Sequence, residues 1–241
     1  MKKEKRNLLR EMIIKLCSNL ARGKILDIGT GDGEYAKQLY DMGFEVVACD
    51  IDNSRFKYLD YLPFRKCDIT KVLPFADESF DIVLLVEVIE HLRNPYEVLQ
   101  NIHRVIKPNG FLIISTPNIL SIKSRIRYLL EGNYEYFREP PLEQSRNPKA
   151  NIFNLHIFAY RYHELEYLLC NSGFKIDEIF TSVYEGYWAL PLVPFIVLQT
   201  SLKAMRAKLK GADVDYNRIK NIILSKELLF GRHLILKVQK A

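Results

Sequence analysis

The sequence predicts a doubly wound α/β fold with a ligand crevice at the carboxyl edge of a parallel sheet. An apolar run at 24–28 stops at glycines on alternate positions, and a helical pattern of apolar residues follows. A second apolar run, 45–50, ends in an acid. A third run, 80–86, is almost wholly apolar, which is typical of a central strand buried on both faces.

Length and composition fit one globular domain over residues 1–241. Hydrophobic residues make up 48% of the chain and charged residues 27%, which are ordinary shares for a globular protein. The four cysteines have no short spacing, so we expect neither a zinc knuckle nor a disulfide framework. The basic N-terminus is not followed by the apolar core of a signal peptide, and we expect a cytoplasmic protein.

Charge is distributed unevenly along the chain. The formal net charge is +6, but residues 1–24 carry +6, residues 203–241 carry +7, and the segment between them carries −7. Basic ends suit an anionic membrane surface or a polyanionic substrate, although solvated helix faces are the more economical interpretation. The acidic middle of the chain disfavours nucleic acid as a partner.

The glycine-rich turn distinguishes two kinds of cofactor. Glycine is needed where the backbone takes unusual dihedral angles or passes close to a ligand. A dinucleotide-binding turn requires glycine at the position that Glu34 occupies. The pattern present is D-x-G-x-G-x-G, and it resembles motif I of the class I S-adenosylmethionine-dependent methyltransferases. The resemblance implies S-adenosylmethionine as the cofactor, held by a set of residues in this turn: Asp27, Gly29, Thr30, Gly31 and Gly33.

Acids follow the next two predicted strands. Asp50, with Ile51 beside it, lies 21 residues beyond Gly29, about the spacing at which an acid accepts hydrogen bonds from ribose hydroxyls. A helix N-cap is the other interpretation of Asp50. In the methyltransferases that the chain resembles, the acid after the third strand bonds the adenine amino group and its neighbour packs on the ring. The resemblance implies these roles for Asp68 and Ile69.

Further motifs extend the resemblance over residues 20–181 and 226–240. The run 73–83 is very close to the family's lead into the fourth strand. The resemblance implies a Rossmann-like sheet of seven strands, mostly parallel, with the sixth strand at 174–180 and an antiparallel last strand at 228–238. Within the superfamily the chain is most similar to methyltransferase type 11 and to the quinone-biosynthesis O-methyltransferases.

Glu87, Glu90 and His91 follow the predicted central strand at positions i, i+3 and i+4. A helical turn there would place all three on one face, where His156 could join them. In methyltransferases with a similar E-x-x-E-H stretch, this set holds a divalent metal; elsewhere in the superfamily the glutamates cap helices or touch the cofactor. We expect Glu87 to contact the cofactor and His91 to act as a base, and the metal stays an open alternative.

Two stretches lie outside the common core. Residues 119–155 combine a basic helical pattern with an aromatic, proline-rich segment, and we expect a lid over the acceptor pocket. The insertion 182–225 contains an uncharged run, 186–202, that Pro191 and Pro194 interrupt. A spanning helix would separate the last two strands across a membrane, so we exclude it. An interfacial segment, a buried cap and a homodimer contact remain as interpretations.

The sequence therefore predicts a methyltransferase that acts on an oxygen of a small-molecule, lipid-linked or saccharide acceptor, with peripheral membrane contact as one option. RNA 2′-O-methylation is the alternative activity, supported by His156 and the basic ends. A non-catalytic partner subunit with the same fold is the alternative of another class. The intact cofactor motif argues against it, because a scaffold need not retain those residues.

Overall fold

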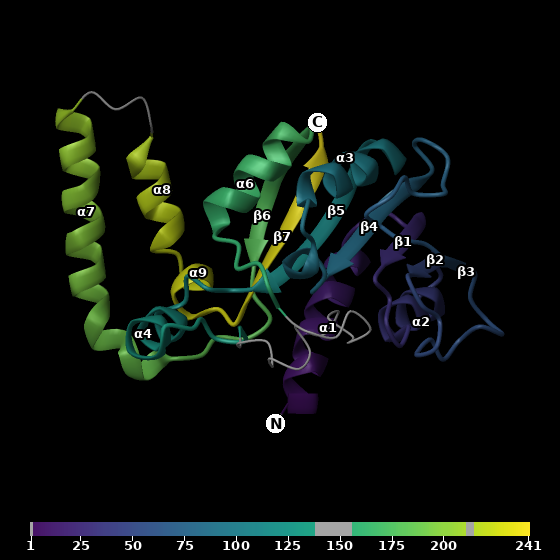
Figure 1. Ribbon diagram of the computed structural model, residues 1–241, viewed down its shortest axis with the longest axis horizontal. Coiled ribbons are helices and arrows are strands. Elements are labelled where there is room, and N and C mark those ends of the chain that lie inside the picture. Colours follow the sequence, from purple (N-terminus) through teal and green to yellow (C-terminus); the bar gives the residue numbers. More distant parts are fainter. Residues whose placement is uncertain (1, 138–155, 211–214) are drawn as a thin grey trace, which may run out of the picture.

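The computed structural model describes residues 2–137, 156–210 and 215–241, with side chains from residue 7 onward. Within these residues the chain forms a seven-stranded sheet in the order β3-β2-β1-β4-β5-β7-β6 (Figure 1). The strands are β1 (Lys24–Ile28), β2 (Glu45–Asp50), β3 (Phe64–Lys66), β4 (Phe80–Val86), β5 (Ile106–Pro117), β6 (Phe174–Phe180) and β7 (His233–Lys240). Neighbours from β3 to β5 are parallel, and β7 is antiparallel to both β5 and β6. The predicted doubly wound sheet with an antiparallel last strand is confirmed.

Helices cover both faces of the sheet. On one face, α1 and α2 bury Ile13 and Leu39 against β1, β2 and β4. On the other face, α3 and α6 bury Leu99 and Leu165. The helices and helical turns are α1 (Lys2–Ser18), α2 (Glu34–Asp41), η1 (Ile89–His91), α3 (Pro95–Val105), α4 (Ile122–Glu131), α6 (Tyr162–Asn171), η3 (Tyr187–Leu192), α7 (Val193–Leu209), α8 (Tyr216–Ile223) and α9 (Lys226–Phe230).

The parallel strands align their carboxyl ends along one edge of the sheet. Ile28 at the end of β1 pairs with Cys49 of β2 and with Leu85 of β4. The loops after these strands therefore meet in one place, which is where ligands bind in doubly wound folds.

The last strand begins later than the sequence predicted. Leu228 to Phe230 lie in α9, because the Ser225 hydroxyl caps this short helix by accepting a hydrogen bond from the Leu228 amide. All three apolar side chains of this helix are buried, as they would be in a strand, so hydrophobicity alone did not distinguish the two structures. The strand starts at His233.

The insertion between β6 and β7 forms a helical arm, η3, α7 and α8, that stands away from the sheet (Figure 1). None of the side chains of α7 is buried, and Trp188, Phe195 and Leu198 are 66%, 62% and 54% exposed. The apolar run is buried only at its start, where Ala189 packs with Ile122 and Phe230. A complete buried cap is not what these exposures show, and the other interpretations of the run stay open. Among the described helices, the run Tyr187–Leu209 has the length and apolar composition that crossing a membrane requires.

The side chain of Asn118 ties the end of β5 to the turn between α9 and β7. Its amide nitrogen donates hydrogen bonds to the carbonyls of Glu227, Leu228 and Gly231 at 3.2, 3.1 and 2.8 Å, and the side chain is buried. Asn118→Ala should lower the free energy of unfolding by about 1–3 kcal/mol, because buried carbonyls lose their donor. Urea titration checks this. The exposed Asn101, which bonds Glu97, is the control: equal losses for Asn101→Ala and Asn118→Ala would contradict the account.

Candidate active site

The turn after β1 leaves one open position among its three glycines. All three take left-handed backbone angles, with φ of +70°, +58° and +83° at Gly29, Gly31 and Gly33. A Cβ at Gly29 would come within 2.6 Å of Val88, and a Cβ at Gly33 within 2.6 Å of Phe56. At Gly31 the nearest atom would be 4.0 Å away. Two glycines therefore permit close packing of the chain, and the space at the Cβ position of Gly31 is open.

Asp27 lies beneath this turn. Its carboxylate is buried and accepts a hydrogen bond of 2.6 Å from the Thr30 hydroxyl. Burial raises the pKa of Asp27 to about 6, and the hydrogen bond from Thr30 offsets part of that rise. Asp27 and Thr30 are thus placed to shape the turn from below.

Acids and apolar side chains alternate along the next part of the edge. Asp50 accepts hydrogen bonds from the Gly31 amide at 2.9 Å and from the Ile51 amide at 2.7 Å. Asp68 accepts from the amide and hydroxyl of Thr70, which hold the pKa of Asp68 below its usual range. Ile51 lies beside Asp50 and is 39% exposed. Carboxylates that can accept hydrogen bonds from ribose hydroxyls therefore lie next to apolar surface that can contact a base, and a nucleoside site needs both.

Glu87 does not share a helical face with Glu90 and His91, contrary to the sequence prediction. Its φ is +54°, and the helical turn η1 begins only at Ile89. The Ser115 hydroxyl donates a hydrogen bond of 2.8 Å to the Glu87 carboxylate, which directs this side chain toward β5. Burial raises the pKa of Glu87, while Ser115 and the charge of Arg232 partly offset the rise.

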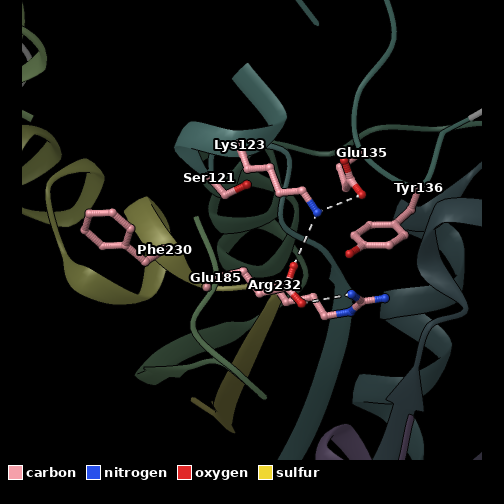
Figure 2. A pocket seen from close by; sticks show the side chains of 8 residues that line it. Ser121, Lys123, Glu135, Tyr136, Glu185, Phe230 and Arg232 are labelled. Atoms are coloured by element: carbon pink, nitrogen blue, oxygen red, sulfur yellow. Dashed lines mark hydrogen bonds and ion pairs between the residues drawn. The ribbon is translucent and has the colours of Figure 1, made fainter. Parts of the chain in front are cut away.

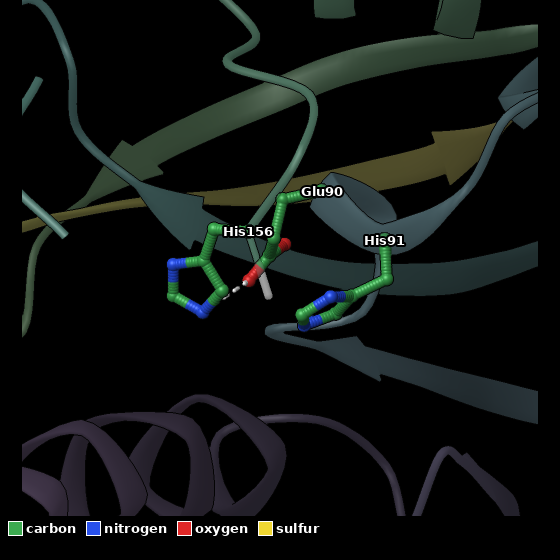
Figure 3. Close-up of side chains that lie close together, drawn as sticks. All are labelled: Glu90, His91 and His156. Carbon is green, nitrogen blue, oxygen red and sulfur yellow. Dashed lines mark ion pairs between the residues drawn. The ribbon is translucent and has the colours of Figure 1, made fainter. Parts of the chain in front are cut away.

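Glu90, His91 and His156 lie together after β4 (Figure 3). Each offers one potential ligand atom, and the three atoms lie within 4.8 Å of one another. Glu90 comes closest to His156, with 3.8 Å between Oε1 and Nε2, and the two imidazole rings lie 5.1 Å apart. The amides of Ile157 and Phe158 donate to the Glu90 carbonyl, so the main chain holds His156 at this place.

The charge state of this cluster is set by burial. The Glu90 side chain is fully buried, and within the described part of the chain neither carboxylate oxygen has a hydrogen bond of ordinary geometry. Burial and the charge of Glu87 raise the pKa of Glu90 far above its usual value. Burial and the neighbouring His91 lower the pKa of His156 to about 4. Burial therefore favours the protonated form of Glu90, and His156 is uncharged at neutral pH.

One wall of the site combines Tyr136, from the predicted lid, with Arg232 and His233, which the sequence did not single out. Tyr136 has φ of +72°, and its ring lies 4.3 Å from the Arg232 guanidinium carbon and stacks on His233. His233 Nε2 lies 3.9 Å from Glu87. Arg232 and His233 could be placed here only from the start of the last strand. The structure starts that strand at His233, whereas the sequence predicted a start at Leu228.

Ion pairs close the space behind this wall (Figure 2). Lys123 pairs with Glu135 at 3.2 Å and with Glu185 at 3.4 Å, and Arg232 pairs with Glu185 at 3.1 Å. The cavity that these residues line is about 10 Å³, room for a single water. It is too small for a methyl acceptor, so this cluster braces the wall.

A parallel sheet in this strand order, with an open glycine turn flanked by acids, defines the Rossmann-like class of proteins that bind nucleoside-containing cofactors. The family profile described as a methyltransferase domain matches residues 26–114. A ubiquinone biosynthesis O-methyltransferase of Rickettsia bellii is 32% identical over 190 residues, 71% of this chain and 79% of that protein. The chain belongs to the S-adenosylmethionine-dependent methyltransferase family that includes this relative.

Other relatives match over a smaller share of their length. The chain spans 38% of a ubiquinone biosynthesis O-methyltransferase of Rickettsia conorii, at 32% identity, and 39% of the mitochondrial one of Rattus norvegicus, at 30% identity. These matches cover 43% and 51% of this chain. Among solved structures, a methyltransferase from Archaeoglobus fulgidus aligns with a TM-score of 0.61 and 19% identity, over 98% of this chain and 94% of that one. This likeness supports the fold.

The open position at Gly31 yields a test of cofactor binding. S-adenosylhomocysteine should raise the melting temperature of the protein, and Gly31→Val should abolish that rise, because the new side chain would occupy the crevice. Gly132→Val is the matched control, since Gly132 also has a left-handed backbone (φ +74°) and open space around its Cβ position, but lies at the end of α4. A ligand-induced shift that survives in Gly31→Val would contradict this placement.

Proposed function

We propose that this chain transfers the methyl group of S-adenosylmethionine to an oxygen of a small-molecule acceptor. One observation carries the proposal: the cluster of Glu90, His91 and His156 follows β4 at the same sheet edge as the open face of Gly31, after the neighbouring strand β1. A cofactor over Gly31 and an acceptor beside the cluster would lie next to each other. Methyl transfer needs chiefly this placement of nucleophile and methyl group.

The residues of the crevice would divide the cofactor between them. Asp50 would accept from ribose hydroxyls, Asp68 would bond the adenine amino group, and Ile51 and Ile69 would contact the ring. Glu87, held by Ser115 at the floor of the site, would face the methionyl part. When bound, the cofactor supplies an electrophilic methyl group.

His91 is the proposed base. An alcohol or phenol loses its proton as its oxygen attacks, and a neutral imidazole beside the acceptor can take that proton. The ring of His156 lies beside that of His91. The lowered pKa of His156 keeps it uncharged at neutral pH. Burial raises the pKa of Glu90 and so disfavours a negative charge that would repel a phenolate.

The same cluster fits a divalent cation, and the buried Glu90 is the observation that favours this second role. Its carboxylate oxygens lack ordinary hydrogen-bond partners in the described chain and lie near two imidazoles. One carboxylate and two imidazoles are a common donor set for transition metals. Glu90 would give up its proton on binding the ion.

The acceptor is proposed to enter between the cluster and the segment that follows α4. Tyr136 and Phe137 are the described end of the predicted lid; residues 138–155, which include the rest of it, lie outside the described residues. Phe137 contacts His156, with 5.6 Å between ring centres. A small, lipid-linked or saccharide acceptor suits this aromatic wall, whose described part, Tyr136 and Phe137, offers no row of basic side chains for RNA.

We also propose that the arm formed by η3, α7 and α8 rests on a membrane surface. Its exposed apolar side chains are followed by four basic residues: Lys203, Arg206, Lys208 and Lys210. An apolar face with adjoining positive charge suits the interface of an anionic bilayer. A spanning helix fits poorly, because the chain that leaves β6 returns to its paired neighbour β7.

Variants separate the base from the metal ligand. If His91 is the base, His91→Ala should lower kcat about a hundred-fold or more with cofactor binding unchanged, and kcat/KM should rise with pH as imidazole loses its proton. If the cluster binds metal, a chelator should inactivate the enzyme and added divalent ion should restore it. Glu90→Ala and His156→Ala should then fail alike and lose bound metal in elemental analysis. Full activity of His91→Ala together with indifference to chelator contradicts both roles.

Sedimentation with vesicles tests the arm. Binding should require anionic lipid and weaken as salt rises, since charge attraction contributes. Leu198→Asp should reduce binding, while Leu129→Asp on α4, where the leucine is 82% exposed, should leave it unchanged. Absence of binding, with a dimer that dissociates in Leu192→Asp, would instead make the arm a contact between two copies of the chain.

A further inference from the structure

Polar side chains from two neighbouring strands lie on either side of the Glu87 carboxyl group. Ser115 on β5 lies opposite Ile235 on β7, and His233 lies two residues before Ile235 on the same strand. Because side chains on a strand alternate between faces, Ser115 and His233 lie on the same face of the sheet. Glu87 Oε1 accepts the hydrogen bond from Ser115 at 2.8 Å, and Glu87 Oε2 lies 3.9 Å from His233 Nε2. A hydroxyl and an imidazole therefore flank this acid.

The His233 ring is held at its other nitrogen and on one face. Nδ1 lies 2.5 Å from the Ser182 hydroxyl, and the Tyr136 ring stacks on the imidazole with 6.4 Å between ring centres. The main chain beside it is held as well, because the Arg232 amide donates to the Val183 carbonyl at 2.9 Å. The His233 side chain is buried. Nε2 is thus the ring nitrogen that is left to face the acid.

The neighbours of His233 also determine which ring nitrogen carries the proton. Burial lowers the pKa of His233 to about 3, and the charge of Arg232 acts in the same direction, so the ring is neutral and has one N–H. A lone pair on Nε2 would face the lone pairs of the Glu87 carboxylate, which is unfavourable. When Glu87 is ionised the proton therefore belongs on Nε2, and the Ser182 hydroxyl then donates to Nδ1.

The geometry points to His233 and Ser182 as positioning residues that hold Glu87 for the amino-acid part of the cofactor. The 3.9 Å between Nε2 and Oε2 exceeds an ordinary hydrogen bond, and a movement of about 1 Å by the Glu87 carboxylate would bring it within that length. With Ser115 on one oxygen and His233 on the other, the carboxylate would present its remaining lone pairs to the cofactor's ammonium group. The inference rests on the proposed function and adds to it two residues that act through Glu87.

Two ligands that differ in the amino-acid part separate positioning from a general loss of structure. S-adenosylhomocysteine contains that part, and 5′-methylthioadenosine shares its adenosine and thioether but lacks it. In calorimetry, His233→Asn should weaken S-adenosylhomocysteine by about threefold to tenfold, because Glu87 loses one donor, and should leave methylthioadenosine unchanged. His233→Gln, whose longer amide can place an N–H near the position of Nε2, should weaken it less. Ser182→Ala should give a smaller loss with the same ligand selectivity.

A double variant tests whether His233 acts through Glu87. Glu87→Gln should itself weaken S-adenosylhomocysteine, and adding His233→Asn to it should cause little further loss, because the two side chains act on one contact. His103→Asn is the control: His103 also packs edge-on against a ring, that of Phe174, which pairs with the far end of β7. This variant should change the affinity for neither ligand.

The outcomes keep this inference apart from the proposed function. Equal weakening of both ligands in His233→Asn, unchanged affinity for S-adenosylhomocysteine, or full additivity with Glu87→Gln overturns the positioning role. If His233→Asn does not fold, Ser182→Ala carries the same comparison of the two ligands. A wild type that does not bind S-adenosylhomocysteine overturns the proposed function and this inference with it. A wild type that binds it, with variants that do not distinguish the two ligands, overturns the inference alone.

Discussion

The turn after β4 holds the functional parts of this molecule together. Val88 fills the space that a Cβ at Gly29 would need, so the glycine turn of β1 and the β4 loop fit only as a pair. Ser115 of β5 binds both the amide and the carboxylate of Glu87. The Glu90 carbonyl accepts two amides from the segment of His156. One short stretch thus contacts the glycine turn of β1, Ser115 of β5 and the segment of His156, and a shift in it would move all three.

The site contains buried carboxyl groups whose loss of water is not fully offset by hydrogen bonds. Glu90 loses water and gains no ordinary hydrogen bond from the described chain. For Asp27, hydrogen bonds from the Thr30 hydroxyl and the Ala36 backbone offset only part of the effect of burial. Burial raises the pKa values of both acids and so disfavours negative charge at this edge of the sheet. A buried carboxylate without a partner is energetically costly. Either protonation of Glu90 or a cation bound to it would remove that cost.

The features that the sequence predicted correctly are those set by residues close together in the chain. The features that it missed depend on contacts between residues far apart in the chain. Glycine spacing, apolar runs and the acids after β2 and β3 are local signals, and the structure places them at one edge as expected. The direction of the Glu87 side chain depends on Ser115, which lies 28 residues away. Whether the side chains of the apolar run at 186–202 are buried depends on contacts with distant parts of the chain, which composition does not reveal. Leu228 to Phe230 had one pattern compatible with two structures, and the Ser225 cap selected the helix.

Calorimetric titration with S-adenosylhomocysteine and with NAD tests the central claim most directly. Glu34 stands where a dinucleotide-binding turn needs glycine, and Gly31 opens onto a crevice flanked by Asp50 and Asp68. The account predicts one-to-one binding of S-adenosylhomocysteine, weakened in Asp50→Ala, with no saturable heat from NAD. Tighter binding of NAD than of S-adenosylhomocysteine would contradict it.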